Sequence, residues 1–116
     1  DIIKEEGLQQ NAETMGNYLK KELTRLQQDF PILADIRGQG LFLGVELTDQ
    51  NKNPLSFQCS YLVERMLEQG FLMSTEGPDN NVLKIKPPLV FSKQNADEFL
   101  ENLQLILTES CMQINN

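Results

Sequence analysis

The sequence contains no histidine, and it holds two cysteines, Cys59 and Cys111, that lie far apart. Without histidine, Ser-His-Asp catalysis, Cys-His catalysis and every imidazole-ligated metal site are excluded. Because neither cysteine belongs to a CxxC pair, zinc-ribbon and thioredoxin-like sites are excluded as well. A single disulfide stays open, but two reduced thiols in a reducing cytoplasm are the favoured interpretation.

Basic residues are also scarce. Ten lysines and arginines stand against seventeen aspartates and glutamates, which gives a net charge of −7. A chain this acidic does not suit nucleic acid or an anionic membrane surface, both of which reward a basic face. No apolar run approaches the roughly 18 residues of a membrane span. Asp49, Asn51 and Asn53 lack the glycine and the closing glutamate of a calcium loop, so we predict a turn there and no metal site.

The chain has 116 residues, of which 40% are hydrophobic. This length and composition suit a single globular domain. Apolar residues recur at helical spacing in three stretches, which are residues 8–26, 59–67 and 96–107. Between them, alternation predicts a strand pair over residues 36–47, a short strand at residues 71–73 and another strand at residues 82–86. This order predicts an α+β fold, a small and mainly antiparallel sheet covered on one face by helices.

The two ends of the chain carry different signals. Residues 1–7, DIIKEEG, have no helix-start signal, and Gly7 is a residue type that commonly terminates helices. We therefore predict that residues 1–7 are the end of a preceding helix, so that the chain begins inside an element as a fragment would. Residues 111–116 are expected to be a frayed tail. Residues 1–116 then make a single domain.

Arg37 opens the stretch RGQGLFLG, whose three glycines could suggest a phosphate-binding loop. A dinucleotide fingerprint requires G-x-G-x-x-G before a helix, but three residues separate Gly40 from Gly44 and a strand follows. The glycines are better explained by a tight turn or a bulge at Gly38 and Gly40 and by a close approach of another backbone or side chain to Gly44. For Arg37, a structural ion pair is favoured over contact with a partner surface.

Lys84 and Lys86 alternate along the strand predicted at residues 82–86, so both are expected on one face, roughly 6.6 Å apart. Leu83 and Ile85 should then face the helices. Two interpretations stay open, a solvated strand face or an anion site, because an ammonium group acts as a point charge for phosphate or carboxylate.

Three stretches together resemble the C-terminal small domain of the class III pyridoxal-phosphate-dependent aminotransferases, a domain of the fold type I enzymes. They are DIIKEEGLQQNAETMGNYLKKELTRL at residues 1–26, DIRGQGLFLGVEL at residues 35–47 and NVLKIKPPLVFS at residues 81–92. The middle stretch is similar to the family's RGxGL…G…L segment and is the most specific. The resemblance covers nearly the whole chain.

The resemblance implies an enzyme that extends beyond this chain. In the family, an N-terminal large domain carries the lysine that holds pyridoxal phosphate, and the cofactor serves as an electron sink. The small domain closes over the active site and contributes substrate contacts, so this chain alone is expected to be inactive and to bind no cofactor. The parent enzyme is expected to be a cytoplasmic homodimer that acts on a small-molecule amine.

The position of Lys84 refines the resemblance. Many family members have an arginine there that holds the substrate's α-carboxylate by a two-pronged contact, which lysine cannot reproduce. NVLKIKPPL, with Gly77-Pro78 before it, is similar to the branch with alanine–glyoxylate aminotransferase 2-like proteins and ethanolamine-phosphate phospho-lyase. On this resemblance we assign substrate binding to Lys84 and Lys86, and no residue of the chain to catalysis or cofactor binding. We expect a parent that transfers an amino group to a keto acid or aldehyde. The alternatives are a phospho-lyase acting on a phosphorylated amine and, from another class, a free-standing α+β interaction module.

Overall fold

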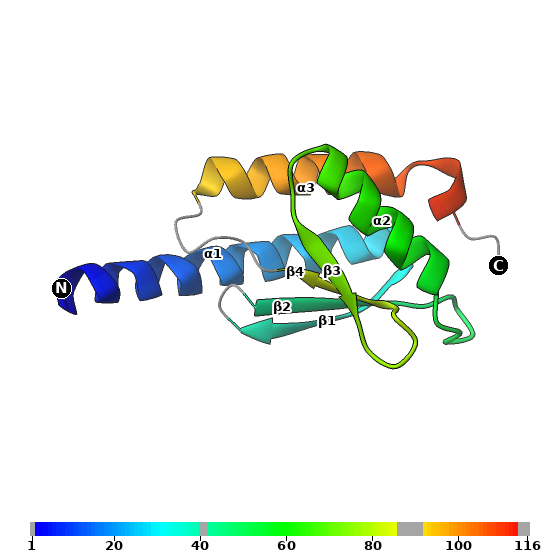
Figure 1. Ribbon diagram of the computed structural model, residues 1–116, viewed down its shortest axis with the longest axis horizontal. Coiled ribbons are helices and arrows are strands. Elements are labelled where there is room, and N and C mark those ends of the chain that lie inside the picture. The colour runs from blue at the N-terminus through cyan, green and yellow to red at the C-terminus, as the bar shows by residue number, and fades with distance from the viewer. Residues whose placement is uncertain (1, 40–41, 86–91, 114–116) are drawn as a thin grey trace.

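The structure, a computed structural model, describes residues 2–39, 42–85 and 92–113 (Figure 1). Within these ranges the elements follow one another as α1 (Ile2–Asp29), β1 (Leu33–Gln39), β2 (Phe42–Leu47), α2 (Ser56–Glu68), β3 (Met73–Glu76), β4 (Val82–Ile85), α3 (Lys93–Leu107) and the 3-10 turn η1 (Ser110–Met112). None of the helices described is both long and apolar enough to cross a membrane.

The four strands form one antiparallel sheet in the order β1-β2-β4-β3. The three helices lie together on one side of this sheet (Figure 1). Along β2 the alternation is clear, because Leu43, Val45 and Leu47 are buried toward the helices whereas Phe42 on the other face is exposed. The predicted α+β architecture, an antiparallel sheet with helices on one face, is therefore confirmed.

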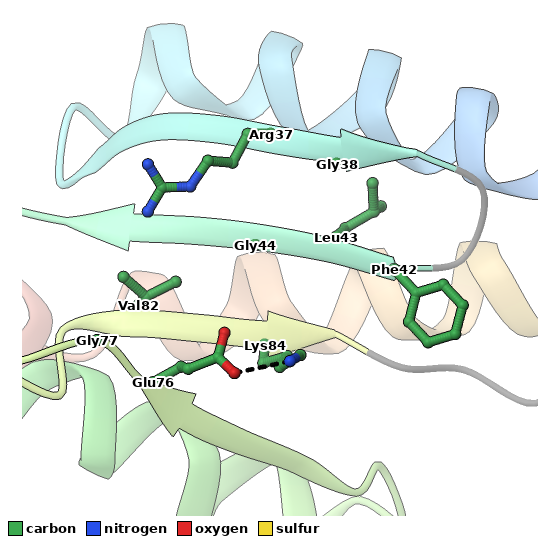
Figure 2. Close-up of a pocket in the computed structure, with 9 residues that line it drawn as sticks. All are labelled: Arg37, Gly38, Phe42, Leu43, Gly44, Glu76, Gly77, Val82 and Lys84. Atoms are coloured by element: carbon green, nitrogen blue, oxygen red, sulfur yellow. Dashed lines mark hydrogen bonds and ion pairs between the residues drawn. The ribbon is translucent and has the colours of Figure 1, made fainter.

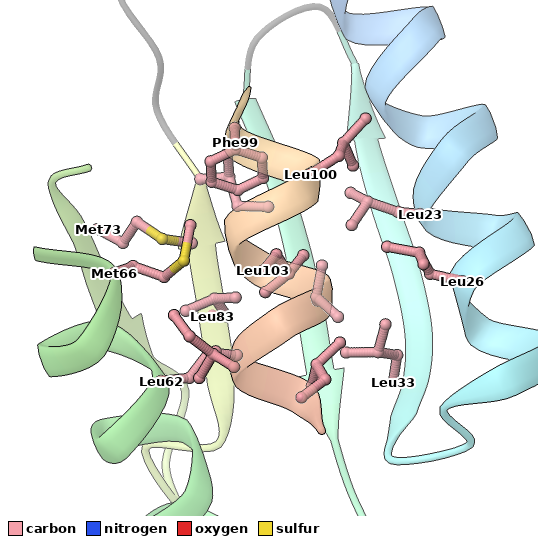
Figure 3. Close-up of a cluster of buried hydrophobic side chains, with 14 of the residues drawn as sticks. Leu23, Leu26, Leu33, Leu62, Met66, Met73, Leu83, Phe99, Leu100 and Leu103 are labelled. Carbon is pink, nitrogen blue, oxygen red and sulfur yellow. The ribbon is translucent and has the colours of Figure 1, made fainter. Parts of the chain in front are cut away.

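A single apolar core fills the space between helices and sheet (Figure 3). Leu23 of α1, Leu62 of α2, Leu83 of β4 and Leu103 of α3 are all fully buried in it. Each helix turns one apolar stripe toward the strands, which is how an amphipathic helix covers a sheet. The core lies on the helix side, and the opposite face of the sheet carries Arg37 and Lys84 together with the apolar side chains of Phe42 and Val82.

The prediction that a preceding helix ends at Gly7 is wrong. The helix α1 runs without interruption from Ile2 to Asp29. A glycine inside a helix costs only about 1 kcal/mol relative to alanine, and α1 is rich in leucine, glutamine, glutamate and lysine, which favour helix. Packing of Leu19 and Leu23 in the core also stabilises the later turns of the helix.

The third strand lies two residues later than predicted. The Phe71 amide donates to the Met66 carbonyl at 2.9 Å, so Phe71 closes the end of α2 instead of starting a strand. Its ring meets the Phe99 ring edge-on, with centroids 5.5 Å apart, which accounts for its apolar character. The strand β3 consists of Met73–Glu76, and its last residue pairs with Val82.

The predicted frayed tail is also wrong where the structure describes it. Ser110–Met112 form the turn η1, and Met112 is 2% exposed in the core. A buried methionine fixes the chain after α3, because leaving the core would expose its apolar side chain to water. Residues 114–116, which the prediction also covered, lie outside the described residues.

Candidate functional site

The candidate site lies on the sheet face that the helices do not cover, here called the open face (Figure 2). The strand register places Arg37, Gly44, Lys84 and Ser74 in one row across β1, β2, β4 and β3. Residues directly opposite each other in a sheet share a face, so this row crosses the open face. A groove of about 400 Å³ lies over it, lined by Arg37, Gly38, Phe42, Leu43, Gly44, Glu76, Gly77, Val82 and Lys84.

Lys84 lies on the open face, as the alternation of β4 predicted. Its neighbours Leu83 and Ile85 are 0% and 2% exposed on the helix side. The Lys84 Nζ lies 2.6 Å from Glu76 Oε1, in a pair whose side chains are 29% and 54% exposed. The groove therefore has a positive charge whose described partner is a carboxylate open to solvent. Lys86, the second predicted substrate contact, lies outside the described residues, and a ligand role for both lysines stays a prediction.

Arg37 takes part in ion pairs on the same face, in agreement with its favoured interpretation. Its Nη1 lies 3.4 Å from Asp35 Oδ2, and its Nη2 lies 3.7 Å from Glu46 Oε2. The Arg37 side chain is 56% exposed, and exposed pairs of this kind contribute at most about 1 kcal/mol. The guanidinium group extends from β1 toward β2, beside the groove (Figure 2).

The glycines of RGQGLFLG fall into two kinds. Gly38 has φ 124°, and a Cβ there would clash with the Phe42 carbonyl oxygen and lie 2.9 Å from Leu43 Cα. The conformation at Gly38 therefore requires glycine, but Gly38 lies within β1, paired with Leu43, and not in a turn. Gly40 lies outside the described residues. At Gly44 a Cβ would meet Val82 Cγ1 at 3.5 Å, an ordinary contact distance. The close approach predicted at Gly44 is wrong for the residues that the structure describes.

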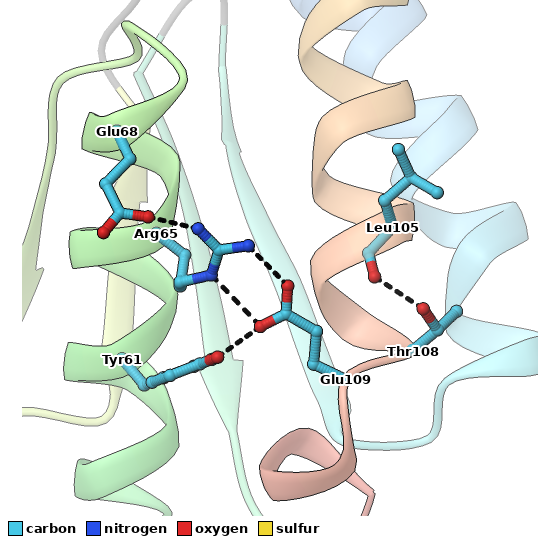
Figure 4. Close-up of polar contacts among 6 residues, drawn as sticks. All are labelled: Tyr61, Arg65, Glu68, Leu105, Thr108 and Glu109. Atoms are coloured by element: carbon cyan, nitrogen blue, oxygen red, sulfur yellow. Dashed lines mark hydrogen bonds and ion pairs between the residues drawn. The ribbon is translucent and has the colours of Figure 1, made fainter.

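A polar cluster that the sequence did not reveal joins α2 to the end of α3 (Figure 4). The Arg65 Nη2 lies 2.7 Å from Glu109 Oε2, and the Tyr61 hydroxyl and the Arg65 Nε both donate to Glu109 Oε1. Arg65 also pairs with Glu68. The i, i+4 spacing of Tyr61 and Arg65 is a local signal, but nothing local indicates a partner 44 residues later.

The charges of this cluster shift its titration. The Arg65 guanidinium, and after it the Tyr61 hydroxyl, lowers the pKa of Glu109 to about 2. The hydrogen bond to Glu109 is the main cause that raises the pKa of Tyr61 to about 12. The cluster belongs to the helix layer and shares no lining residue with the groove. We assign it to holding α2 against the chain that follows α3.

A second polar contact joins α1 to α3. The Tyr18 hydroxyl donates to Asp97 Oδ1, and Lys93 Nζ lies 3.1 Å from Asp97 Oδ2. The same ammonium lies 5.3 Å from the centroid of the Tyr18 ring. Together these partners lower the pKa of Asp97, with the Tyr18 hydrogen bond as the largest cause. This contact also belongs to the helix layer.

Neither thiols nor metal ligands form a further site in the described part of the chain. Cys59 and Cys111 are free thiols, and burial raises the pKa of Cys59 to about 11, far from the value of a reactive thiolate. The residues described contain no group of three or more acidic or cysteine side chains that could hold a metal ion. The groove on the open face is therefore the candidate site.

Comparisons with known proteins agree on one family. The family described as Aminotransferase class-III matches residues 1–107. The chain is 44% identical over 110 residues to the alanine–glyoxylate aminotransferase 2-like protein of Drosophila melanogaster, a match that covers 92% of this chain and 22% of that protein. It is 36% identical over 110 residues to the ethanolamine-phosphate phospho-lyase homolog 1 of Caenorhabditis elegans, covering 92% of this chain and 24% of that one.

A solved structure also matches this chain in fold. The phospholyase from Arthrobacter, determined in complex with phosphoethanolamine, superposes with a TM-score of 0.84 at 38% identity. The superposition covers 91% of this chain and 26% of that chain. This chain thus spans about a quarter of the length of the proteins that it matches.

Proposed function

Because the chain belongs to the class III aminotransferase family, we propose that it is the C-terminal small domain of a longer enzyme, where it closes over the active site and supplies substrate contacts. The family depends on pyridoxal phosphate, which supplies an electron sink for amine chemistry when bound. A free-standing interaction module is not favoured, since the family match covers residues 1–107. In this proposal the partners are the N-terminal large domain of the same protein and a second copy in a cytoplasmic homodimer.

The glycines of the groove and the two lysines Lys84 and Lys93 do not offer a site for the cofactor by themselves. Gly38 and Gly44 lie on paired strands instead of at the start of a helix, where backbone amides would be free for a phosphate. Lys84 is paired with Glu76, and Lys93 is paired with Asp97. We therefore assign every cofactor contact to the remainder of the longer enzyme.

The assignment of a substrate contact to this domain rests on the position of Lys84. Burial of Leu83 and Ile85 holds β4 in the core and leaves the intervening Lys84 on the open face, in the groove. An exposed pair such as the one with Glu76 is worth little in free energy, so the anionic group of a substrate can replace the Glu76 carboxylate. Lys86 is the second substrate contact of this proposal, by its alternation with Lys84 in the sequence.

In this proposal the longer enzyme transfers an amino group from a small amine to a keto acid or aldehyde, which the match to the Drosophila melanogaster aminotransferase-like protein supports. The second candidate is a phospho-lyase that splits a phosphorylated amine. Two observations favour the phospho-lyase candidate. The Arthrobacter relative was determined in complex with phosphoethanolamine, and the point charge of Lys84 suits phosphate.

A substrate panel on the full-length enzyme separates the two reactions. L-alanine with glyoxylate should yield a keto acid if the enzyme is a transaminase, whereas phosphoethanolamine should release inorganic phosphate if it is a phospho-lyase. Lys84→Ala should raise KM for the anionic substrate at least about ten-fold, the value of a hydrogen bond to a charged group. Lys21→Ala, on the exposed side of α1, is the matched control. Unchanged kinetics of Lys84→Ala on every anionic substrate would rule out the substrate contact.

A further inference from the structure

Gly44 is a glycine that the described fold does not require. It lies inside β2, where glycine weakens a strand because it has no side chain to pack and loses much backbone freedom on folding. Among the described glycines, positive φ angles occur at Gly38, Gly70 and Gly77 but not at Gly44. The backbone of Gly44 is therefore one that any residue can adopt.

Packing does not require a glycine at position 44 either. The nearest described atoms to a Cβ placed there are Val82 Cγ1 at 3.5 Å and Arg37 Cγ at 4.0 Å. Both distances are ordinary van der Waals contacts with side chains, in contrast to the backbone clash at Gly38. An alanine at position 44 would fit the sheet, but it would cover the floor of the groove.

The absent side chain leaves bare backbone between two positive side chains (Figure 2). Gly44 pairs with Arg37 on one side and with Lys84 on the other. Since neighbouring strands lie about 4.8 Å apart, the Cα atoms of Arg37 and Lys84 are about 10 Å apart across Gly44. A carboxylate or phosphate group fits between side chains rooted at that spacing. Phe42 and Val82 add apolar surface to the same groove.

We propose that Gly44 is a specificity-determining position, whose missing side chain lets the anionic group of the substrate lie on β2 between Lys84 and Arg37. Arg37 then supplies the planar, two-pronged contact that Lys84 cannot make. Its pairs with Asp35 and Glu46, at 3.4 Å and 3.7 Å, are exposed and long enough to exchange for a ligand. This inference rests on the proposed function, because it takes Lys84 to be a substrate contact.

The experiment uses the full-length enzyme with its cofactor and compares Gly44→Ala, Gly44→Val and Lys84→Ala. Inorganic phosphate and acetate serve as competitive inhibitors, and KM is measured for the anionic substrate that the enzyme turns over. We expect both inhibition constants and KM to rise in the order alanine, then valine, reaching about ten-fold for Gly44→Val, while kcat changes less than two-fold. Ser74→Thr, which adds one methyl group on the same face outside the groove, should change none of these values.

The melting temperature distinguishes this role from a structural one. If Gly44 keeps space for a ligand, Gly44→Ala melts at or above the temperature of the unchanged enzyme. If another segment of the longer protein instead packs against Gly44, an added methyl group would disturb that contact. Gly44→Ala would then lower the melting temperature, and the inference would be overturned. It is equally overturned if neither anion inhibits the unchanged enzyme, or if Lys84→Ala raises KM and Gly44→Val does not. An unchanged KM in Lys84→Ala would instead reject the proposed function.

Discussion

Arg65 of α2 holds Glu109, which follows α3, by two parallel contacts, Nε to Oε1 at 3.1 Å and Nη2 to Oε2 at 2.7 Å (Figure 4). The two side chains are 30% and 29% exposed, so the contact is only partly screened by water. A bidentate pair between arginine and a carboxylate fixes orientation as well as distance. It connects α2 to the short segment between α3 and η1.

Replacing Glu109 by glutamine should lower the melting temperature of the 116-residue chain at pH 7. The pKa of Glu109 is lowered to about 2 in the folded state, below its ordinary value of 4.5. Its contribution to stability is therefore complete above about pH 4.5 and is lost as the pH falls toward 2. We expect the difference in melting temperature between the unchanged chain and Glu109→Gln to be largest at neutral pH and to shrink by pH 2.5.

Glu64→Gln provides the matched control, since Glu64 is an exposed carboxylate next to Arg65 on α2. It should show no comparable loss at either pH. A Glu109→Gln chain that melts at the same temperature as the unchanged chain at pH 7 would show that the contact adds no stability.

Leu103→Ala should destabilise the chain by about 2–5 kcal/mol, because it opens a cavity under α3. Leu103 is fully buried among the side chains of the core (Figure 3). Leu105, two residues later on the same helix, is 60% exposed, and Leu105→Ala should change stability by less than about 0.5 kcal/mol. Chemical denaturation followed by circular dichroism measures both, and equal effects would mean that the buried face of α3 is assigned incorrectly.

Gly38→Ala should be more damaging than Gly70→Ala, although both glycines have positive φ angles. At Gly70 nothing described lies within 4 Å of an added Cβ, so only the backbone cost of about 1–2 kcal/mol applies. At Gly38, with φ 124°, an added Cβ would also strike the Phe42 carbonyl oxygen. We expect a loss of about 3 kcal/mol or more for Gly38→Ala in the same denaturation assay. Similar losses for the two variants would contradict the tight β1–β2 geometry.

Local periodicity predicted much of this fold. Alternation along β2 and the helical stripe through Cys59, Leu62 and Met66 both correspond to the burial that the structure has. These patterns are readable because each side chain's direction depends only on its own element. The resemblance carried by the RGxGL segment is likewise confirmed by the family match over residues 1–107.

Two features escaped prediction because distant residues decide them. Phe71 looked like part of a strand, but its ring packs on Phe99 of α3, which the local sequence does not reveal. The pair between Lys84 and Glu76 depends on the register of β3 against β4. Sequence spacing gave the face on which Lys84 lies, but it could not give the carboxylate beside it.

The isolated 116-residue chain should not hold pyridoxal phosphate at a defined lysine. Its described lysines include Lys84, paired with Glu76, and Lys93, paired with Asp97. Treatment with pyridoxal phosphate and then borohydride, followed by peptide mass mapping, should give only low and scattered labelling of lysines.

The longer enzyme proposed above is the positive control for this labelling, and its labelled lysine should lie outside residues 1–116. Addition of free pyridoxal phosphate should leave the melting temperature of the isolated chain unchanged, because a ligand stabilises a fold only when it binds the folded state. Stoichiometric labelling of one lysine within residues 1–116, together with a rise in melting temperature, would overturn the assignment. The cofactor site would then belong to this domain, and Lys84, as the lysine in the groove, would be the first residue to test by substitution.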